Sequence, residues 1–295
     1  MKRYEGGVLA VDGLDLQVES GECFGLLGPN GAGKTTTVEI LEGLLAPTAG
    51  DVEVLGLRWS TDARALRERL GVSLQQTHLP ERLSVLEIVT MFRALFAKGR
   101  SPEDVLRAVS LEEKSGVWYE RLSGGQKQRL AVACALVGDP DMVFLDEPTT
   151  GLDPQSRLQL WDVVEGFKRA GRTVLLTTHH MDEAERLCDR IGVVDHGRLI
   201  ALGTPRELIA SLGGQEVIEL AAASLDEQGL ASVPGIRSVR RVADGFALAA
   251  GPLHTALPAL VDYLRAANVR LERLTTRHAT LEDVFVSLTG RGLRD

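Results

Sequence analysis

Short apolar runs alternate with helix-like segments through most of the first 200 residues. Four runs are expected to be strands: Glu22–Leu27, Gly71–Leu74, Met142–Leu145 and Thr173–Thr177, the last two of them buried. Helical patterns lie between or after them, at Lys34–Leu44, Ala63–Leu70, Pro154–Arg169 and Met181–Asp189. Continuous apolar strands that alternate with helices are typical of a parallel sheet covered on both faces. The pattern therefore predicts an α/β core.

Weaker periodicities surround this core. Two short strands are expected within Val8–Val18, one more at Asp51–Val54, and a hairpin over Ile191–Val194 and Leu199–Leu202. The stretch from about 84 to 137 is helical instead, with Ser84 and Ser123 as helix caps. One apolar helix face there comprises Ile88, Phe92, Leu95 and Phe96. We interpret this face as core of a helical subdomain rather than as a docking surface.

The pattern changes after Leu212, where Gly213–Gln215 resembles a linker. The order of elements beyond it is strand, helix, strand, strand, helix, strand, followed by a last helix over Leu281–Leu288 that Thr280 can cap. This order predicts a small ferredoxin-like α+β domain. We therefore expect two domains, at 1–212 and 215–295, with the helical subdomain inside the first.

Composition narrows the class of protein. The 295 residues carry a formal net charge of −8 and are 44% hydrophobic, which excludes a mainly disordered chain and disfavours broad nucleic-acid binding. No apolar run approaches the roughly 20 residues that cross a bilayer as a helix, and Met1–Glu5 is not followed by a signal-peptide core. The three cysteines are far apart, which favours neither disulfides nor a zinc site and fits a reducing cytoplasm.

A glycine-rich loop carries the first chemical motif. Residues 28–35 match G-x-x-x-x-G-K-[ST] between an expected strand and helix: Gly28, Pro29, Asn30, Gly31, Ala32, Gly33, Lys34 and Thr35. Such a loop turns its N–H groups inward to form an anion nest, and the following helix adds its positive end. Lys34 can then reach the β- and γ-phosphates, and Thr35 offers a hydroxyl to Mg²⁺. The motif predicts nucleotide binding.

A pair of acids supplies the second motif. Asp146 and Glu147 end the apolar run Met142–Leu145, at the carboxyl edge where α/β sheets bind ligands. Asp146 can hold Mg²⁺ through its water shell, and Glu147 can accept a hydrogen bond from a water that attacks the γ-phosphate. The pair therefore predicts nucleotide hydrolysis.

Several classes of nucleotide-binding enzyme share a glycine-rich loop. The segment that distinguishes among them here is Leu122-Ser123-Gly124-Gly125-Gln126. With it, the chain resembles the ATP-binding cassette (ABC) ATPases, whose signature this pentapeptide is, over roughly Tyr4–Leu212. The resemblance implies that Ser123–Gln126 binds the γ-phosphate of an ATP held by the opposite subunit. The 25–36 segment, which ends at Thr36, is most similar to bacterial drug-resistance-type exporters, as is the tail that begins at Thr280.

The resemblance assigns further site residues. Gln75 matches the glutamine that contacts Mg²⁺ and senses the membrane partner, Asp153 belongs to the loop that touches the other subunit, and His179 matches the histidine that binds the γ-phosphate. Gln76 and His180 are adjacent alternatives. Gln75 and His179 are preferred because each directly follows its apolar strand. Tyr4 matches the aromatic residue that stacks on adenine. Family members usually have a strand before it, whereas this sequence begins almost at Tyr4, so either the amino terminus is truncated or the sheet lacks an edge strand.

The resemblance implies an ATPase, with Glu147, His179, Lys34 and Gln75 catalytic and ATP and Mg²⁺ as cofactors. It would drive a transporter of drugs, lipids or other amphipathic molecules from the cytoplasmic face of the membrane. Its partners would be separate multispanning subunits, docked near Gln75–Ile88, and a second cassette, for example another copy of this chain. The alternative is a soluble ABC ATPase of assembly, translation or repair.

Overall fold

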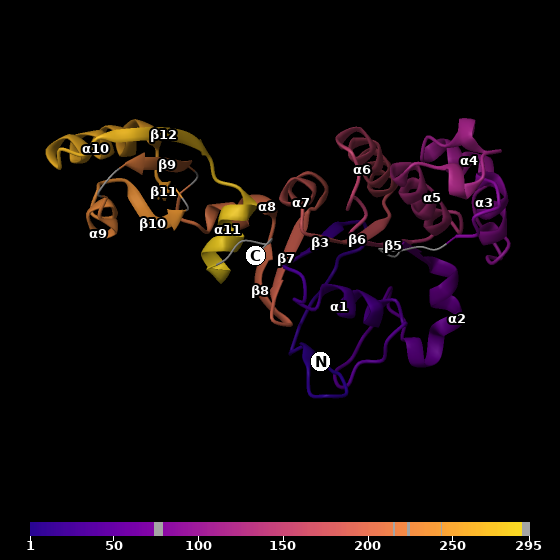
Figure 1. Cartoon of the computed structure of the whole chain (residues 1–295). Helices are drawn as coiled ribbons and strands as arrows, with labels where there is room; N and C mark the ends of the chain where they lie inside the picture. The colour runs from indigo at the N-terminus through magenta and orange to yellow at the C-terminus, as the bar shows by residue number, and fades with distance from the viewer. Residues whose placement is uncertain (74–78, 215, 223–224, 243, 291–295) are drawn as a thin grey trace. The chain divides into compact units, whose positions relative to one another are not determined.

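The computed structural model describes residues 1–73, 79–214, 216–222, 225–242 and 244–290. The chain forms two compact units, Met1–Leu202 and Gly203–Asp295, coloured along the chain in Figure 1.

A six-stranded sheet forms the centre of the first unit. Its strands lie in the order β4 (Leu70–Ser73), β5 (Met142–Asp146), β6 (Thr173–Thr178), β3 (Cys23–Leu27), β7 (Arg190–Asp195) and β8 (Arg198–Gly203). The pairs from β4 to β7 are parallel. Every residue of β3, β5 and β6 is buried, because helices cover both faces. The predicted parallel α/β core is confirmed.

Helices pack on both sides of this sheet. In Figure 1, α1 (Lys34–Leu41) and α2 (Trp59–Arg69) lie below it. Three helices lie above it: α5 (Gly124–Leu136), α6 (Pro154–Arg169) and α7 (Met181–Leu187). These helices connect the parallel strands. Because the strands from β4 to β7 are parallel, their carboxyl ends lie at one edge of the sheet.

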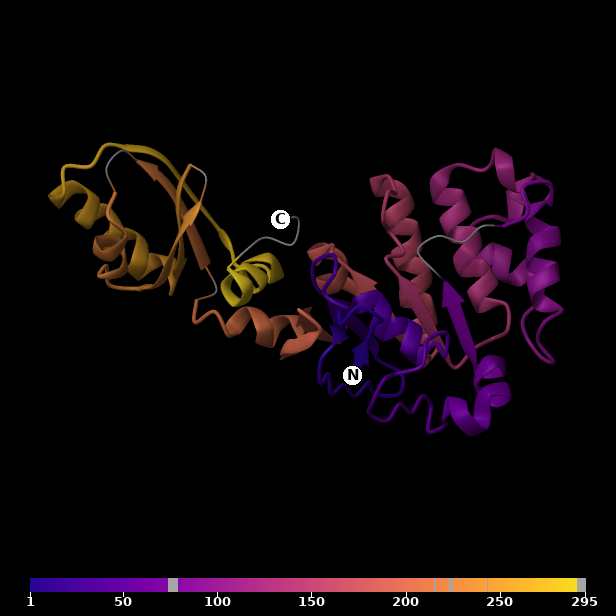
Figure 2. The same ribbon diagram turned by 60° about the horizontal axis from the view of Figure 1, so that its bottom comes forward.

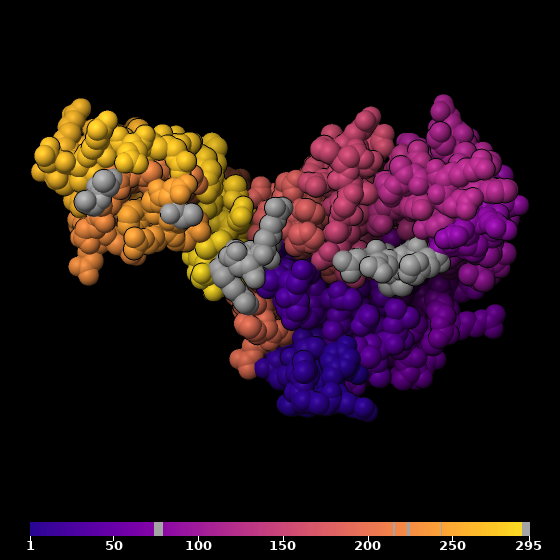
Figure 3. Space-filling model, viewed as in Figure 1, coloured from indigo at the N-terminus to yellow at the C-terminus, as the bar shows by residue number. Residues whose placement is uncertain are grey.

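The helical lobe is made from α3 (Val85–Arg93), α4 (Pro102–Ala108) and α5, and is magenta in Figure 3. Two short 3₁₀ turns, Glu112–Lys114 and Tyr119–Arg121, connect α4 to α5. Ser84 caps α3 as predicted, since its hydroxyl accepts the Glu87 N–H. The prediction that Leu95 belongs to the apolar face of this helix is wrong. Leu95 is 72% exposed because α3 ends at Arg93.

Two expected strands near the amino terminus do not form. A short sheet pairs β1 (Lys2–Arg3) with β2 (Leu9–Val11), and no second strand follows β2 within residues 12–18. The side chains of Leu14, Leu16 and Val18 still pack against buried residues. The alternation of apolar residues therefore indicates that one face of this segment is buried, and does not indicate hydrogen bonding to a neighbouring strand. The expected strand at 51–54 is reduced to a single bridge, Val54 to Leu57.

The second unit contains a four-stranded antiparallel sheet in the order β10-β11-β9-β12. Its elements along the chain are α8 (Pro205–Ala210), β9 (Glu216–Ala222), α9 (Glu227–Ala231), β10 (Ile236–Val242), β11 (Gly245–Ala250), α10 (Leu253–Ala266), β12 (Leu271–His278) and α11 (Leu281–Thr289). Helices α9 and α10 lie on one face of this sheet (Figure 2), and apolar side chains of both helices belong to its core. The predicted ferredoxin-like arrangement is confirmed.

Candidate active site

The carboxyl ends of three neighbouring strands are aligned at one edge of the large sheet. In the parallel register, Leu27 of β3 lies beside Thr178 of β6, and Thr177 of β6 lies beside Asp146 of β5. Gly28, Glu147 and His179 follow these strands directly. Register alone therefore gathers the glycine-rich loop, the acidic pair and a histidine at one place.

The glycine-rich loop requires glycine at three positions. Gly31 and Gly33 have φ values of 80° and 97°, in the left-handed region that side chains disfavour. A Cβ on Gly33 would collide with the Ala10 carbonyl oxygen, and one on Gly28 with the Val194 carbonyl oxygen. Gly33 caps α1, which leaves the first N–H groups of that helix free for an anionic ligand.

Lys34 lies under the loop rather than in solvent. Its Nζ donates hydrogen bonds to the Gly28 and Pro29 carbonyl oxygens at 2.7 and 3.1 Å, and lies 3.9 Å from Glu147 Oε1. Burial lowers the pKa of this ammonium, while the carboxylates of Glu147 and Asp146 oppose that shift. The cation is thus positioned where phosphate oxygens would meet the loop.

Asp146 is held by two hydroxyl groups. Thr177 Oγ1 donates to Asp146 Oδ1, and Thr35 Oγ1 donates to Asp146 Oδ2 at 3.4 Å. A carboxylate and a hydroxyl at the end of a phosphate loop are hard oxygen ligands of the kind that Mg²⁺ prefers beside substrate phosphates. The donor set therefore fits Mg²⁺.

Glu147 and His179 face each other. Glu147 has a left-handed backbone (φ 46°), and its N–H donates to the carbonyl and hydroxyl oxygens of Thr177. His179 Nδ1 lies 3.3 Å from Glu147 Oε1, and Thr150 Oγ1 donates to Glu147 Oε2 at 3.1 Å. The backbone N–H of the neighbouring His180 donates to Thr178 Oγ1. The His179 imidazole therefore faces the Glu147 carboxylate.

Tyr4 lies next to the first turn of α1. Its hydroxyl is 3.3 Å from Thr36 Oγ1, the Lys2 ammonium lies 5.5 Å from its ring centroid, and the side chain is 39% exposed. A flat, partly exposed ring beside the phosphate loop offers a surface for a nucleobase.

The segment Ser123–Gln126 forms a separate group. Ser123 and Gln126 make a capping box at the start of α5, and Gly125 packs against Ser156 on α6. Asp153 caps α6 by accepting the N–H and hydroxyl of Ser156, which lowers the pKa of its carboxyl. The side-chain hydrogen bonds of Ser123 and Gln126 run between these two residues, at the start of α5.

Two threonines of the site were missed by the sequence analysis, and one predicted residue lies outside the described residues. Thr177 and Thr150 bond Asp146 and Glu147. The pair Thr177-Thr178 is polar although it ends a buried strand, and this feature of the sequence could have identified Thr177 as a site residue. Gln75, like its alternative Gln76, falls in residues 74–78, which the structure does not describe.

Glu42 is a buried acid near this site. It caps the C-terminus of α1, is 5% exposed, and neither carboxyl oxygen has a hydrogen-bond partner among the described residues. Burial, together with the negative charges of Asp146 and Glu39, raises the pKa of Glu42 to about 8. The carboxyl is therefore mostly protonated in the folded chain at neutral pH.

Replacement of Glu42 by glutamine is expected to stabilise the first unit increasingly as pH rises. The pKa of Glu42 is higher in the folded chain than in the unfolded one. The contribution of this carboxyl to the free energy of unfolding is therefore fully present below about pH 4.5 and is lost as the pH rises to about 8. Urea unfolding at several pH values should show a growing difference, by at most about 1.4 kcal/mol per pH unit. The exposed Glu103→Gln variant should show a constant difference. A constant difference for Glu42→Gln too would contradict this interpretation.

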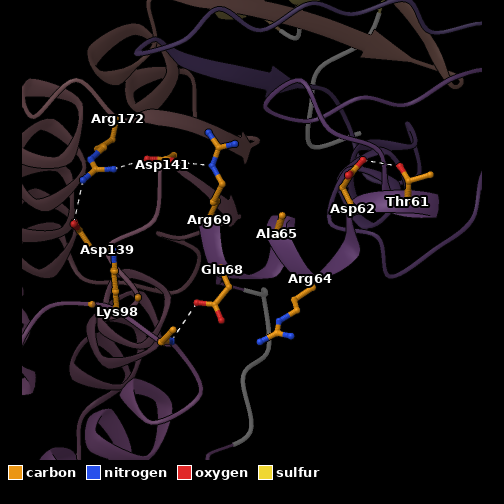
Figure 4. A pocket seen from close by; sticks show the side chains of 13 residues that line it. Thr61, Asp62, Arg64, Ala65, Glu68, Arg69, Lys98, Asp139, Asp141 and Arg172 are labelled. Carbon is orange, nitrogen blue, oxygen red and sulfur yellow. Dashed lines mark hydrogen bonds and ion pairs between the residues drawn. The ribbon is translucent and has the colours of Figure 1, made fainter.

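An open cavity of about 880 Å³ lies at the opposite edge of the sheet (Figure 4). Arg69, Asp141 and Arg172 directly precede β4, β5 and β6, so they line the amino-terminal edge. Asp141 bridges the two arginines at 2.6 and 2.7 Å. This cavity is therefore distinct from the Lys34–Glu147 cluster and is lined by an ion-pair network.

Comparison with known proteins decides the family. A family model described as "ABC transporter" matches residues 11–150, and one described as "ATP-binding protein DrrA1-3-like, C-terminal domain" matches residues 203–289. The chain is 41% identical over 303 residues to "Nod factor export ATP-binding protein I" of Paraburkholderia xenovorans, with 100% of this chain and 97% of that protein covered. The chain belongs to the ABC transporter family. It is an ATP-hydrolysing subunit of that family.

Other relatives of this ABC subunit agree. The protein of the same name from Burkholderia thailandensis is 42% identical over 305 residues, with 100% and 96% of the chains covered. A solved "ATP binding subunit of ABC transporter" superposes with a TM-score of 0.63 at 28% identity, over 69% of this chain and 87% of the other. A dimeric ATP-binding cassette in a post-hydrolysis state, bound to ADP and Pi, also gives 0.63 at 27% identity, over 69% and 95%.

Proposed function

We propose that the loop at 28–35 binds the phosphates of ATP and that Lys34 is their main cationic contact. The free N–H groups at the start of α1 and the buried ammonium present positive charge to one place. Tyr4 stacks on the adenine, which is supported by its exposed ring beside Thr36. Thr36 lies in the first turn of α1, as Lys34 does, and contacts the nucleotide as well.

Mg²⁺ would be held by Thr35 and Asp146 together with the phosphate oxygens, and Gln75 is proposed as a further ligand. When bound, the ion neutralises charge on the β- and γ-phosphates. Thr177 orients the Asp146 carboxylate through the hydrogen bond to Oδ1. This hydrogen bond from Thr177 positions the Asp146 carboxylate before the nucleotide binds.

Glu147 acts as the general base of hydrolysis. Its carboxylate takes a proton from a water molecule, the water oxygen forms a bond to the γ-phosphorus, and the bond to the leaving ADP oxygen breaks. Lys34 and His179 stabilise the negative charge on the γ-phosphate oxygens. The observation that carries this proposal is the placement of Glu147 Oε1 between Lys34 Nζ (3.9 Å) and His179 Nδ1 (3.3 Å).

A second cassette completes the site. Ser123 and Gln126 form a capping box at the start of a 13-residue helix, and their side-chain hydrogen bonds are to each other. In the closed pair, this helix start contacts the γ-phosphate held by the partner's loop, and Asp153 lies at the same boundary. The dimeric cassette among the solved relatives supports the pairing. Two copies of this chain are the simplest such pair.

The transporter is proposed to be an exporter. Curated relatives that match along the whole chain are named as export ATP-binding proteins, which favours export over a soluble assembly, translation or repair machine. Drugs, lipids or other amphipathic molecules are the proposed cargo. Among the described residues, no helix has the length and hydropathy needed to cross a membrane. The chain would bind separate membrane subunits at the cytoplasmic face.

Co-purification tests the transporter assignment. The tagged chain, expressed in its own organism and extracted in detergent, is expected to elute with a multispanning membrane protein. The Lys34→Ala variant should elute with the same protein, because Lys34 lies outside the expected docking segment at Gln75–Ile88. Recovery of both variants without any membrane protein, under conditions that preserve other transporters, would contradict the assignment.

A further inference from the structure

The turn between β7 and β8 lies against the glycine-rich loop. Its two central residues, His196 and Gly197, both have positive φ values, 47° and 75°. Positive φ at both positions is the geometry of a type I′ turn, which suits the twist of a hairpin. The Gly197 N–H donates to the Ala32 carbonyl oxygen at 2.9 Å. A turn that is distant in the sequence therefore bonds the loop directly.

This hydrogen bond fixes the orientation of one peptide group of the loop. In a trans peptide the carbonyl and the next N–H point in opposite directions, and the peptide bonds of the described residues are trans. Since the Ala32 carbonyl faces Gly197, the Gly33 N–H points away from the turn. Gly33 caps α1, so this N–H lies beside the first N–H groups of the helix. The bond from the turn thus orients one donor of the proposed anion nest.

Apolar packing holds the same two segments together. Ala32 of the loop is 2% exposed, and it belongs to one buried cluster with Val194, which precedes the turn. Leu199, which follows the turn, packs against this cluster. The loop and the turn are therefore joined through side chains as well as through the backbone.

The turn is also joined to the segment after β2. The Asp12 N–H donates to the Gly197 carbonyl oxygen at 2.8 Å. Arg198 Nε and Nη2 lie 2.7 and 2.6 Å from Asp12 Oδ2. Strand β2 pairs with β1, and Tyr4 directly follows β1. The turn therefore connects the β1–β2 hairpin, which carries Tyr4, to the phosphate loop.

The contact between these segments requires glycine at position 197. A Cβ on Gly197 would lie 2.8 Å from the Ala10 carbonyl oxygen, so the turn or the neighbouring segment would have to move. We propose that Gly197 and Arg198 are positioning residues for ATP binding, because they hold the phosphate loop and the hairpin of Tyr4 in a fixed relation. The proposal rests on the nucleotide contacts proposed for the loop and for Tyr4.

Replacement of Gly197 by alanine in the full-length chain is expected to raise the Kd for ATP about 10-fold, the effect of one misplaced hydrogen-bond donor. The new methyl group displaces the turn, and the loop bonded to the turn moves with it. At saturating ATP, kcat should stay within about threefold of the wild type, since Glu147 and His179 follow other strands, β5 and β6. Titration calorimetry gives Kd, and phosphate release gives kcat.

Gly171→Ala is the matched control. Gly171 has nearly the same φ, 76°, but among the described residues a Cβ there would meet nothing within 4 Å apart from its chain neighbours. This variant therefore has the unfavourable backbone conformation without the collision, and its Kd for ATP should equal that of the wild type. The same Kd in Gly197→Ala and Gly171→Ala would overturn the proposal. A lowered kcat with unchanged Kd in Gly197→Ala would also overturn it.

Arg198→Ala removes the side-chain connection and leaves the backbone of the turn unchanged. The Kd for ATP should rise about two- to fivefold, the range for a partly exposed ion pair. Asp12→Ala should have the same effect, and the double variant should bind no more weakly than either single one, because the two side chains act through one contact. Arg107→Ala breaks the exposed pair with Asp104 on α4 and should bind ATP as the wild type does. An unchanged Kd in Arg198→Ala, or effects that add in the double variant, would refute the role of Arg198.

The Lys34→Ala variant distinguishes failure of this proposal from failure of the proposed phosphate site. If Lys34→Ala weakens ATP binding while Gly197→Ala and Arg198→Ala bind ATP as the wild type does, only the role of the turn is refuted. If Lys34→Ala leaves the affinity unchanged, the phosphate site itself is refuted first. If Gly197→Ala does not fold, Arg198→Ala, Asp12→Ala and their double variant decide the question by the same Kd criteria.

Discussion

Glu147→Gln is expected to lower ATP turnover by about 10²- to 10⁴-fold while ATP binding is preserved, because the amide cannot take the proton of the attacking water. The change keeps the size of the side chain and leaves an oxygen that can accept from Thr150. Lys34 keeps its bonds to the Gly28 and Pro29 carbonyl oxygens, so the phosphate loop is unaffected. Mg²⁺-dependent phosphate release and binding of a fluorescent ATP analogue measure the two effects separately.

The exposed Glu103→Gln variant is the matched control, since the same chemical change on α4 should alter neither quantity. Loss of nucleotide binding in Glu147→Gln would show that the carboxylate supports the loop rather than the reaction. Turnover within a fewfold of the wild type would contradict the assignment of Glu147 as the base.

Lys34→Ala is expected to weaken ATP binding about 10- to 100-fold, which is the range for a charged hydrogen-bond partner. Turnover at saturating ATP should also fall by about 10²-fold or more, because the same ammonium stabilises charge that develops in the reaction. Titration calorimetry gives the affinity, and phosphate release gives the turnover.

Lys34→Arg tests shape against charge. The ammonium is 5% exposed and fits between two loop carbonyl oxygens, so the larger planar guanidinium should not restore turnover. Lys98→Ala changes an exposed lysine and should behave as the wild type. Unchanged ATP affinity in Lys34→Ala would refute the loop as the phosphate site.

The main fold could be predicted because burial leaves a periodic signature. Strands β3, β5 and β6 are buried along their length and mainly apolar, and their parallel register then places Gly28, Glu147 and His179 at one edge. The amino-terminal strands could not be predicted as well. Apolar alternation at Leu14, Leu16 and Val18 marks a buried face, whether or not a neighbouring strand pairs with the backbone.

The supporting contacts of the site were harder to predict, because they join segments that are distant in the chain. Thr177 and Asp146 are separated by 31 positions and meet only through the strand register. Asp12 and Arg198 are separated by 186 positions and likewise meet only in the folded chain.

The proposed hydrolysis depends most on ATP bound between two cassettes. The mass of the Glu147→Gln chain, measured by light scattering with Mg²⁺ and ATP, tests this directly. We expect a shift from the mass of one 31.9 kDa chain to that of two, which Lys34→Ala should not show under the same conditions. A Glu147→Gln chain that binds ATP but keeps the mass of a single chain at every concentration would contradict the shared site.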